Sequence, residues 1–427
     1  MQLSWFQIVR LGLVQMCLGA IVVLTTSTLN RLMVVELSLA AVVPGLLVAL
    51  HYGIQLSRPK WGFASDTGGQ RTRWIIGGMV ALAAGALLAT GTILIFPHSF
   101  VLGLAVSIVA YALIGLGVGA SGTSLLALIA TTTAPHRRAG AATVTWLMMI
   151  FGIAVTAGTV GALLDPYTPA LLLKVVFAVT CAAILLTILA VWGIERRLTA
   201  RAEPDSTPFW AGMKEVWRER RARNFTLFVF LSMTAYFMQE LILEPYAGLV
   251  FGFTPGQSTS LSGAQNGGTF MGMLCVGILA TGFKIGSLRG WVIAGCIGSA
   301  LSLMALSVSG LNPAQVPLTP VVVTLGFFNG VFAVAAIGSM MALAGQGRDR
   351  REGTRMGLWG AAQAVAAGFG GLTGAALVDI LRLTTTDAPA FGSVFIIEAA
   401  LFLAAAAMAL RIMDRAPTIP ATLVPGE

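Results

Sequence analysis

The stretch from Phe100 to Thr132 reads FVLGLAVSIVAYALIGLGVGASGTSLLALIATT and contains no charged residue. An α-helix needs about 20 consecutive apolar residues to cross the hydrocarbon core of a bilayer. This stretch exceeds that length without a single Lys, Arg, Asp or Glu. We therefore predict that residues 100–132 form a membrane-spanning helix, and this prediction sets the fold class for the whole chain.

The composition of the 427 residues extends the prediction to the rest of the sequence. Hydrophobic residues make up 57% and charged residues 10%, and the mean hydropathy is +0.87. Soluble domains carry about 25% charged residues. So few ionisable groups do not cover the surface of a soluble protein of this size, and lipid must solvate most of it. We predict an all-α polytopic membrane protein.

Twelve apolar runs of about 20 residues meet the length needed to span a membrane. They cover residues 9–29, 38–56, 74–96, 100–132, 141–163, 171–193, 225–245, 258–280, 291–310, 318–344, 356–380 and 391–410. If the N-terminus is cytoplasmic, 23 of the 26 Lys and Arg residues lie in cytoplasmic loops and tails, and only Arg31, Lys174 and Arg382 fall outside them. This bias predicts that both termini are cytoplasmic. Basic residues spread between spans in this way indicate topology and not a nucleic-acid partner.

The longest polar segment divides the chain into two six-helix halves. We expect an N-terminal half over 1–194, a cytoplasmic linker over 195–224, a C-terminal half over 225–412 and a cytoplasmic tail over 413–427. In the linker, apolar residues recur at helical spacing, and Lys and Arg occupy the opposite side of the expected helix. The apolar residues are Phe209, Met213, Val216 and Trp217. Two interpretations remain open: an amphipathic helix on the anionic inner leaflet, or a solvated connection.

The two halves repeat one another. Arg137-Arg138-Ala139-Gly140 stands six residues before Trp146, and Arg350-Arg351-Glu352-Gly353 stands six residues before Trp359. A second landmark, a basic loop ending in Trp74 or Trp291, recurs in the same order. This predicts an internal duplication of six helices.

The loop between the second and third spans reads Gly-Phe-Ala-Ser-Asp-Thr-Gly-Gly-Gln-Arg over residues 62–71. It resembles the pattern G-x-x-x-D-R-x-G-R-[RK] of the major facilitator superfamily, whose fold is a duplication of six helices. The residues that match are Gly62, Asp66, Gly69 and Arg71, whereas Thr67 and Gln70 replace basic residues. The resemblance implies a cytoplasmic gate in which Asp66 meets the start of the eleventh span near Arg355; a solvated turn is the alternative.

Enzyme signatures are missing from the sequence. It contains no Gly-Lys pair for a P-loop and no D-x-x-D or D-x-x-x-D cluster to hold Mg²⁺ against a diphosphate. The four cysteines lie singly in apolar runs, so we interpret them as core thiols and not as metal ligands. We predict a protein with no catalytic residues and no required cofactor.

Two groups of intramembrane residues are candidates for ligand binding. His51 lies within the second span, and a neutral imidazole there could ligate the metal of a tetrapyrrole; hydrogen-bonded packing is the alternative. We also expect a polar cavity near the outer ends of the helices, or simple interhelical hydrogen bonding there. Its predicted members are Gln239, Glu240, Glu244, Gln265 and Asn266.

Five segments carry a closer resemblance. They are residues 50–59, 62–66, 243–252, 263–268 and 355–364. Through them the whole chain resembles the PucC, or bacteriochlorophyll delivery, family of phototrophic bacteria. The resemblance implies that the protein receives bacteriochlorophyll or a precursor and passes it to light-harvesting polypeptides. It also implies a place in the cytoplasmic or intracytoplasmic photosynthetic membrane. On this interpretation the pigment-binding residues are His51, Gln55, Trp146 and Trp359, with the pigment's Mg²⁺ on His51.

Two other functions remain open. The first is proton-coupled transport of an amphipathic solute, with Glu240, Glu244 or Glu398 as the coupling residue. The second is an accessory role beside bacteriochlorophyll synthase. Few intramembrane spans hold ionisable groups, which favours pigment binding over transport.

Overall fold

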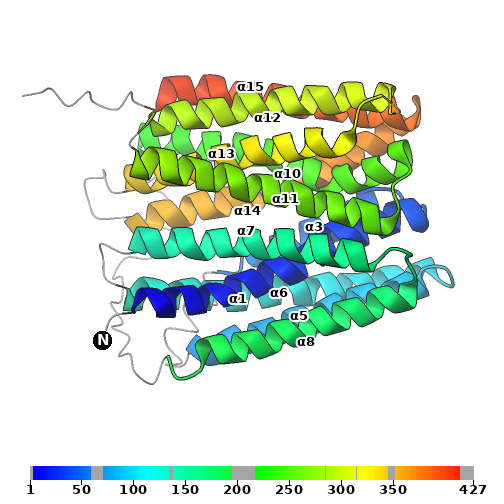
Figure 1. The fold of residues 1–427 in the computed structure, drawn as a ribbon, viewed down its shortest axis with the longest axis horizontal. Helices are drawn as coiled ribbons and strands as arrows, with labels where there is room; N and C mark the ends of the chain where they lie inside the picture. The colour runs from blue at the N-terminus through cyan, green and yellow to red at the C-terminus, as the bar shows by residue number, and fades with distance from the viewer. Residues whose placement is uncertain are drawn as a thin grey trace, which may run out of the picture.

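The computed structural model describes residues 3–58, 71–133, 138–194, 217–283, 285–313, 315–344 and 352–413, and these residues form helices joined by short connections. Figure 1 shows long helices lying roughly parallel in a single bundle. We call the end of the bundle that holds Trp5 and Ile412 the proximal end, and the end that holds Glu36 and Val42 the distal end.

The helices of the N-terminal half begin at defined caps. Ser4 closes a capping box with Gln7 at the start of the first helix, and Ser99 and Thr168 each accept a hydrogen bond from the backbone N–H group three residues further on, in the first turn of α6 and of α8. Such side-chain acceptors satisfy the free N–H groups at a helix start. The helices of this half are α1 (Trp5–Val23), η1 (Leu24–Thr28), α2 (Leu29–Arg31), η2 (Leu32–Glu36), α3 (Val42–Gln55), α5 (Arg71–Ile95), α6 (Phe100–Thr132), α7 (Arg138–Leu163) and α8 (Pro169–Val191).

The C-terminal half repeats the pattern. Thr254 forms a capping box with Gln257 ahead of Pro255, and Ser287 caps the following helix. The helices of this half are α10 (Arg220–Phe251), α11 (Pro255–Val276), η5 (Gly277–Gly282), α12 (Leu288–Leu311), α13 (Leu318–Ala344), α14 (Glu352–Arg382) and α15 (Asp387–Ile412).

Ten helical segments of the described residues are long and apolar enough to cross a membrane. The helix α3, at 14 residues, is shorter, and α11 with η5 is less apolar, yet both lie in the bundle where the second and eighth spans were predicted. The all-α multi-pass membrane fold is therefore confirmed, while the count of twelve spans stays a prediction.

Two predicted spans end earlier than the helices do. The first span was predicted over 9–29, but helix continues without a break from Trp5 to Glu36 and carries Arg31 inside it. The seventh was predicted to end at Pro245, but α10 runs through this proline to Phe251. It stops at Gly252, whose φ of 70° is the left-handed conformation common at helix ends.

Each half has its own hydrophobic core. One cluster of buried side chains is built almost wholly from residues of the N-terminal half, and a second from residues of the C-terminal half. The halves meet where α7 packs on α11 and where α3 packs on α14. If the halves are repeats, these two pairings are equivalent: span five on span eight, and span two on span eleven. The packing thus agrees with the duplication seen in the sequence.

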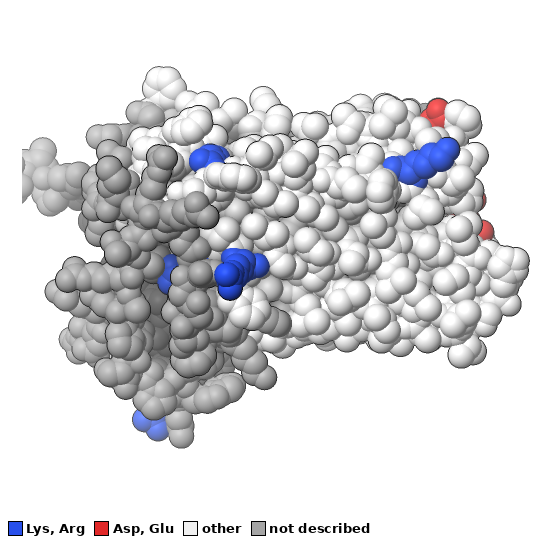
Figure 2. Space-filling model, turned by 90° about the horizontal axis from the view of Figure 1, so that it is seen from below, with Lys and Arg blue, Asp and Glu red and all other residues white. Residues whose placement is uncertain are grey.

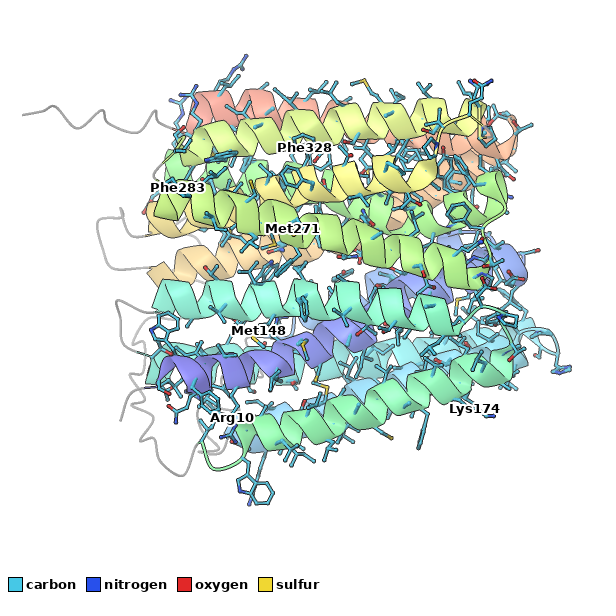
Figure 3. The ribbon with its side chains drawn as sticks, viewed as in Figure 1. Arg10, Met148, Lys174, Met271, Phe283 and Phe328 are labelled. Atoms are coloured by element: carbon cyan, nitrogen blue, oxygen red, sulfur yellow. The ribbon has the colours of Figure 1, made fainter. Side chains whose placement is uncertain are left out.

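The sides of the bundle are apolar. Figure 2 shows one long face with almost no charged side chain between its two ends. On α8 the exposed side chains include Phe177, Leu185 and Leu189, each more than half exposed. In Figure 3, Arg10 lies toward the proximal end of the bundle and Lys174 toward the distal end. Arg10 donates a 2.7 Å hydrogen bond to the carbonyl oxygen of Leu189, which fixes its charge at the bundle surface.

Several predictions lie outside the described residues. These are the linker helix over 209–216 and the tail beyond residue 413. Trp217 is described and is 43% exposed. The division into domains therefore stays a prediction.

Candidate functional site

A cavity of about 300 Å³ lies between the two halves. Its walls come from α1, η1, α3, α6 and α7 on one side and from α10, α11, α13 and α14 on the other. We call it the central cavity. Its volume is at the lower end of the range for small-molecule sites, about 300–1,000 Å³. Most of the surface of its wall is apolar, as in most such sites, and polar side chains from both halves interrupt it.

The N-terminal half contributes a row of polar side chains from α3. His51, Gln55 and Arg58 line the cavity in sequence toward the proximal end. The guanidinium of Arg58 donates to Oε1 of Gln55, and Nε2 of Gln55 lies 2.8 Å from Nε2 of His51. His51 is 1% exposed, and its Nδ1 has no hydrogen-bond partner among the described residues. On the same half, Gln15, Thr26 and Ser27 also line the cavity.

Aromatic rings join the two halves across the cavity. Tyr52 of α3 packs edge-on against Phe237 of α10, with ring centroids 5.7 Å apart. The ring of His51 packs edge-on against Tyr52 at 4.9 Å. Trp146 of α7 lines the cavity and is partly exposed to it. Flat side chains thus stand on both walls.

The C-terminal half contributes all five residues of the predicted polar group. Gln239, Glu240 and Glu244 of α10 and Gln265 and Asn266 of α11 line the same cavity as His51. Asn266 donates a 2.9 Å hydrogen bond to the carbonyl oxygen of Ser262. The carboxyl oxygens of Glu244 and Oε1 of Gln239 are buried without a hydrogen-bond partner among the described residues.

The two predicted groups share this cavity, and a polar ligand site toward the outer ends of the helices stays a prediction. Because α10 extends to Phe251, Glu240 lies about 17 Å from the distal end of its helix. His51 lies about 14 Å from the distal end of α3, at Val42. Either distance is roughly half of the ~30 Å hydrocarbon thickness. The two predicted groups therefore face each other in one cavity, near the middle of the bundle.

Two predicted residues lie elsewhere. Trp359 is 1% exposed and packs edge-on against Phe225 of α10, with ring centroids 4.9 Å apart, so it belongs to the core of the C-terminal half. It is not one of the residues that line the central cavity, and its part in pigment binding stays a prediction. Glu398 of α15 is fully buried in the same half and also does not line the cavity.

The predicted gate is only partly described. Gly62, Asp66 and Gly69 lie outside the described residues. Arg71 is buried at the start of α5 and donates a 3.0 Å hydrogen bond to the carbonyl oxygen of Ala127. Arg355 lies in the first turn of α14. Contact between Asp66 and Arg355 stays a prediction.

The distal side of the cavity is bounded by a seam that sequence reasoning missed. In it α7 and α11 approach so closely that a Cβ on Gly263 would lie 2.5 Å from the backbone nitrogen of Gly158. A Cβ on Gly256 would lie 2.7 Å from the carbonyl oxygen of Gly161. We call these four glycines the glycine seam. The spacing of seven residues between Gly256 and Gly263 was the available signal, since small residues on one helix face permit close packing.

Polar contacts reinforce the distal closure. The carboxylate of Asp379 on α14 accepts hydrogen bonds from the backbone N–H groups of Ala41 and Val42 at the start of α3, at 3.0 and 2.7 Å. The guanidinium of Arg31 lies 2.5 Å from Glu36 and donates to the carbonyl oxygen of Phe253. Asp379 and Arg31 therefore tie the N-terminal half to the C-terminal half at the distal end.

Solved structures place this architecture in a known class. The chain aligns with the nucleoside transporter NupG at a TM-score of 0.73 and 12% identity, over 96% of this chain and 99% of that one. It aligns with a bacterial homologue of the human drug and peptide transporters at a TM-score of 0.70 and 14% identity, over 96% and 98%. Identities this low show the fold alone. The chain is therefore a multi-pass membrane protein with the same fold as these two transporters.

The chain belongs to the PucC family, whose family model, described as PUCC protein, matches residues 28–416. It is 63% identical to the bacteriochlorophyll synthase 44.5 kDa chain of Rhodobacter capsulatus, over 99% of this chain and 100% of that one. It is 30% identical to protein PucC of Cereibacter sphaeroides, over 89% and 85%. The family predicted from the sequence is confirmed.

Proposed function

We propose that the protein binds bacteriochlorophyll or a precursor in the central cavity and passes it to light-harvesting polypeptides. The observation that carries the proposal is the cavity itself, with an apolar wall, aromatic faces on both sides and the His51 row. A flat macrocycle with a prenyl tail needs an apolar pocket and few polar contacts. The name of the R. capsulatus relative supports a pigment as the ligand.

The pigment site in this proposal combines both predicted groups. His51, Gln55 and Trp146 stand on the wall of the N-terminal half, and the five polar residues of α10 and α11 stand opposite. The prenyl tail of the pigment is as apolar as lipid. It can therefore extend out of the cavity between two helices and into the surrounding lipid.

We further propose that the protein does this without catalysis and in the photosynthetic membrane, with both termini cytoplasmic. The word synthase belongs to the name of a relative, whereas the aligned solved structures are transporters. An accessory role beside a bacteriochlorophyll synthase is compatible with pigment binding. It predicts that the protein co-purifies with a prenyltransferase.

The test is pigment binding by protein purified in a mild detergent from a phototrophic host. Ala364 lines the central cavity, while its neighbour Val365 is 46% exposed on the outside of α14. We expect bound pigment absorbance in the wild type and in Val365→Trp, and its loss in Ala364→Trp, where the indole fills the cavity. Colourless wild-type protein, or a gene deletion that leaves antenna levels normal, would refute the proposal.

Proton-coupled transport of an amphipathic solute is the second candidate, and one observation favours it. Glu240 and Glu244 line the central cavity, and ionisable residues inside a membrane protein often belong to proton or substrate pathways. On this interpretation, purified protein in vesicles drives proton-dependent solute flux, and Glu240→Gln abolishes it. Flux that is independent of the proton gradient would exclude this function.

A further inference from the structure

The orientation of the Gln55 side chain follows from His51 on α3 and from Arg58, three residues beyond the end of that helix. The guanidinium of Arg58 contacts Oε1 of Gln55, and the amide nitrogen of Gln55 lies 2.8 Å from Nε2 of His51. A guanidinium has donors and no acceptor, so it must face the oxygen of the amide. The amide nitrogen, which has only donors, therefore faces His51. It donates to Nε2 of that ring.

This contact fixes the tautomer of His51. Because Nε2 accepts a hydrogen bond, it carries a lone pair and no proton. A neutral imidazole has one N–H, which must then be at Nδ1. A charged imidazolium would set two donors against each other at Nε2. The ring is therefore neutral, with its proton on Nδ1.

The N–H at Nδ1 is a donor without an acceptor. Nδ1 is buried and has no hydrogen-bond partner among the described residues, and His51 as a whole is 1% exposed. Most buried polar groups have a partner, and one that lacks a partner calls for an explanation. His51 lines the central cavity, so a molecule bound there is the available source of an acceptor.

Metal coordination does not fit this ring. A metal ion needs a free nitrogen lone pair. The lone pair of Nε2 is already engaged by Gln55, and Nδ1 carries the proton. Coordination would require the row from His51 to Arg58 to break. A carbonyl oxygen, by contrast, pairs with Nδ1–H without any change in the row.

We infer that His51 recognises the ligand by donating a hydrogen bond from Nδ1 to a carbonyl oxygen, and does not coordinate a metal. The inference rests on the proposed function and deepens it: the group recognised is a carbonyl on the rim of the tetrapyrrole, and the predicted bond from His51 to Mg²⁺ is replaced. Gln55 and Arg58 hold the ring in the donating tautomer.

The test compares a magnesium bacteriochlorophyll with its magnesium-free counterpart, both titrated into detergent-purified protein. Because His51→Leu removes the donor and leaves the ligand carbonyl unpaired, we expect it to weaken binding of both pigments equally, by roughly tenfold, or about 1.4 kcal/mol. His51→Asn, whose amide nitrogen can stand where Nδ1 stood, should bind both nearly as the wild type does. His98→Leu, an exposed histidine outside the cavity, is the matched control and should change nothing.

A vibrational measurement checks the same contact without relying on affinities. In the wild type, one carbonyl stretching band of the bound pigment should lie below its frequency in an aprotic solvent. The shift should disappear in His51→Leu. In Gln55→Leu, which frees the tautomer, the band should split into bonded and free components. A band at the free-carbonyl frequency in the wild type would overturn the inference.

The outcomes separate the two proposals. A loss confined to the magnesium pigment in His51→Leu would overturn the inference in favour of coordination. Equal affinities of the wild type and His51→Leu would overturn it as well, while leaving pigment binding intact. Wild-type protein that binds neither pigment refutes the proposed function, and the inference falls with it.

Discussion

Adding one methyl group to the glycine seam should destabilise the protein measurably. In Gly263→Ala the new Cβ would lie 2.5 Å from the nitrogen of Gly158 and 2.9 Å from its Cα, where ordinary contact is 3.4–4 Å. Both opposing atoms are backbone, so α7 and α11 must move apart by roughly 1 Å. Overpacking of this kind costs about 1–3 kcal/mol.

The matched control is Gly267→Ala, one turn further along the same helix. A Cβ there meets nothing within 4 Å. Replacing an unhindered helical glycine by alanine stabilises a helix by about 0.5–1 kcal/mol. The two variants should therefore shift the free energy of unfolding in opposite directions from the wild type and differ from each other by about 1.5–4 kcal/mol.

Thermal unfolding in one detergent, followed by tryptophan fluorescence, measures this difference. We expect a Tm several degrees below the wild type for Gly263→Ala and a Tm at or above it for Gly267→Ala. Equal Tm values for the two variants would show that the halves do not meet at this seam. The close approach of α7 and α11 would then be wrong.

Three further predictions concern other contacts. Asp379→Ala removes the acceptor for two N–H groups at the start of α3 and should lower the free energy of unfolding by about 1–3 kcal/mol. Its control, Asp387→Ala, breaks only an ion pair at the surface and should lower it by less than about 1 kcal/mol. Similar losses of Tm in the two variants would contradict this prediction. Tyr246→Phe removes a buried 2.6 Å hydrogen bond to a backbone carbonyl and should lower stability by about 1 kcal/mol, and an unchanged Tm would argue against the bond. Cys181 is exposed and Cys296 is buried, so an apolar maleimide should label Cys181 first and Cys296 only on unfolding, as mass spectrometry of the adducts would show.

The fold was predictable where hydropathy alone decides the structure. The helix α6 runs from Phe100 to Thr132, the limits predicted for the charge-free stretch. No tertiary contact is needed to define such a helix, because the lipid environment requires every backbone group to be paired within it.

The first span was predicted too short because its last polar residues find partners in the other half. Asn30 donates to the carbonyl oxygen of Leu241, and Arg31 donates to that of Phe253. A hydropathy pattern treats these side chains as solvated and ends the span before them. The partners lie more than 200 residues away, so the sequence alone does not reveal that the helix continues.

The site was predictable residue by residue but not as an assembly. His51 and Glu240 stood out because each is ionisable within an apolar span. That they line one cavity depends on α10 continuing past Pro245 and on α3 crossing α14, and neither follows from local patterns. Trp359 misled because the repeat equates it with Trp146, yet in the C-terminal half Phe225 covers that position.

The first span contains two π-helical turns, η1 and η2, and each is what a one-residue insertion into an α-helix would produce. A π turn holds one more residue than an α turn, so each acts as a one-residue insertion that rotates everything beyond it by about 100°. In η1 four successive polar residues, from Thr25 to Thr28, are all buried, which a single face of a regular α-helix does not allow. Deleting one residue there would leave a regular helix of the same polarity but turn Asn30 and Arg31 away from the C-terminal half. The number of residues in the first span, as much as their chemistry, therefore decides whether the side chains of Asn30 and Arg31 reach the C-terminal half.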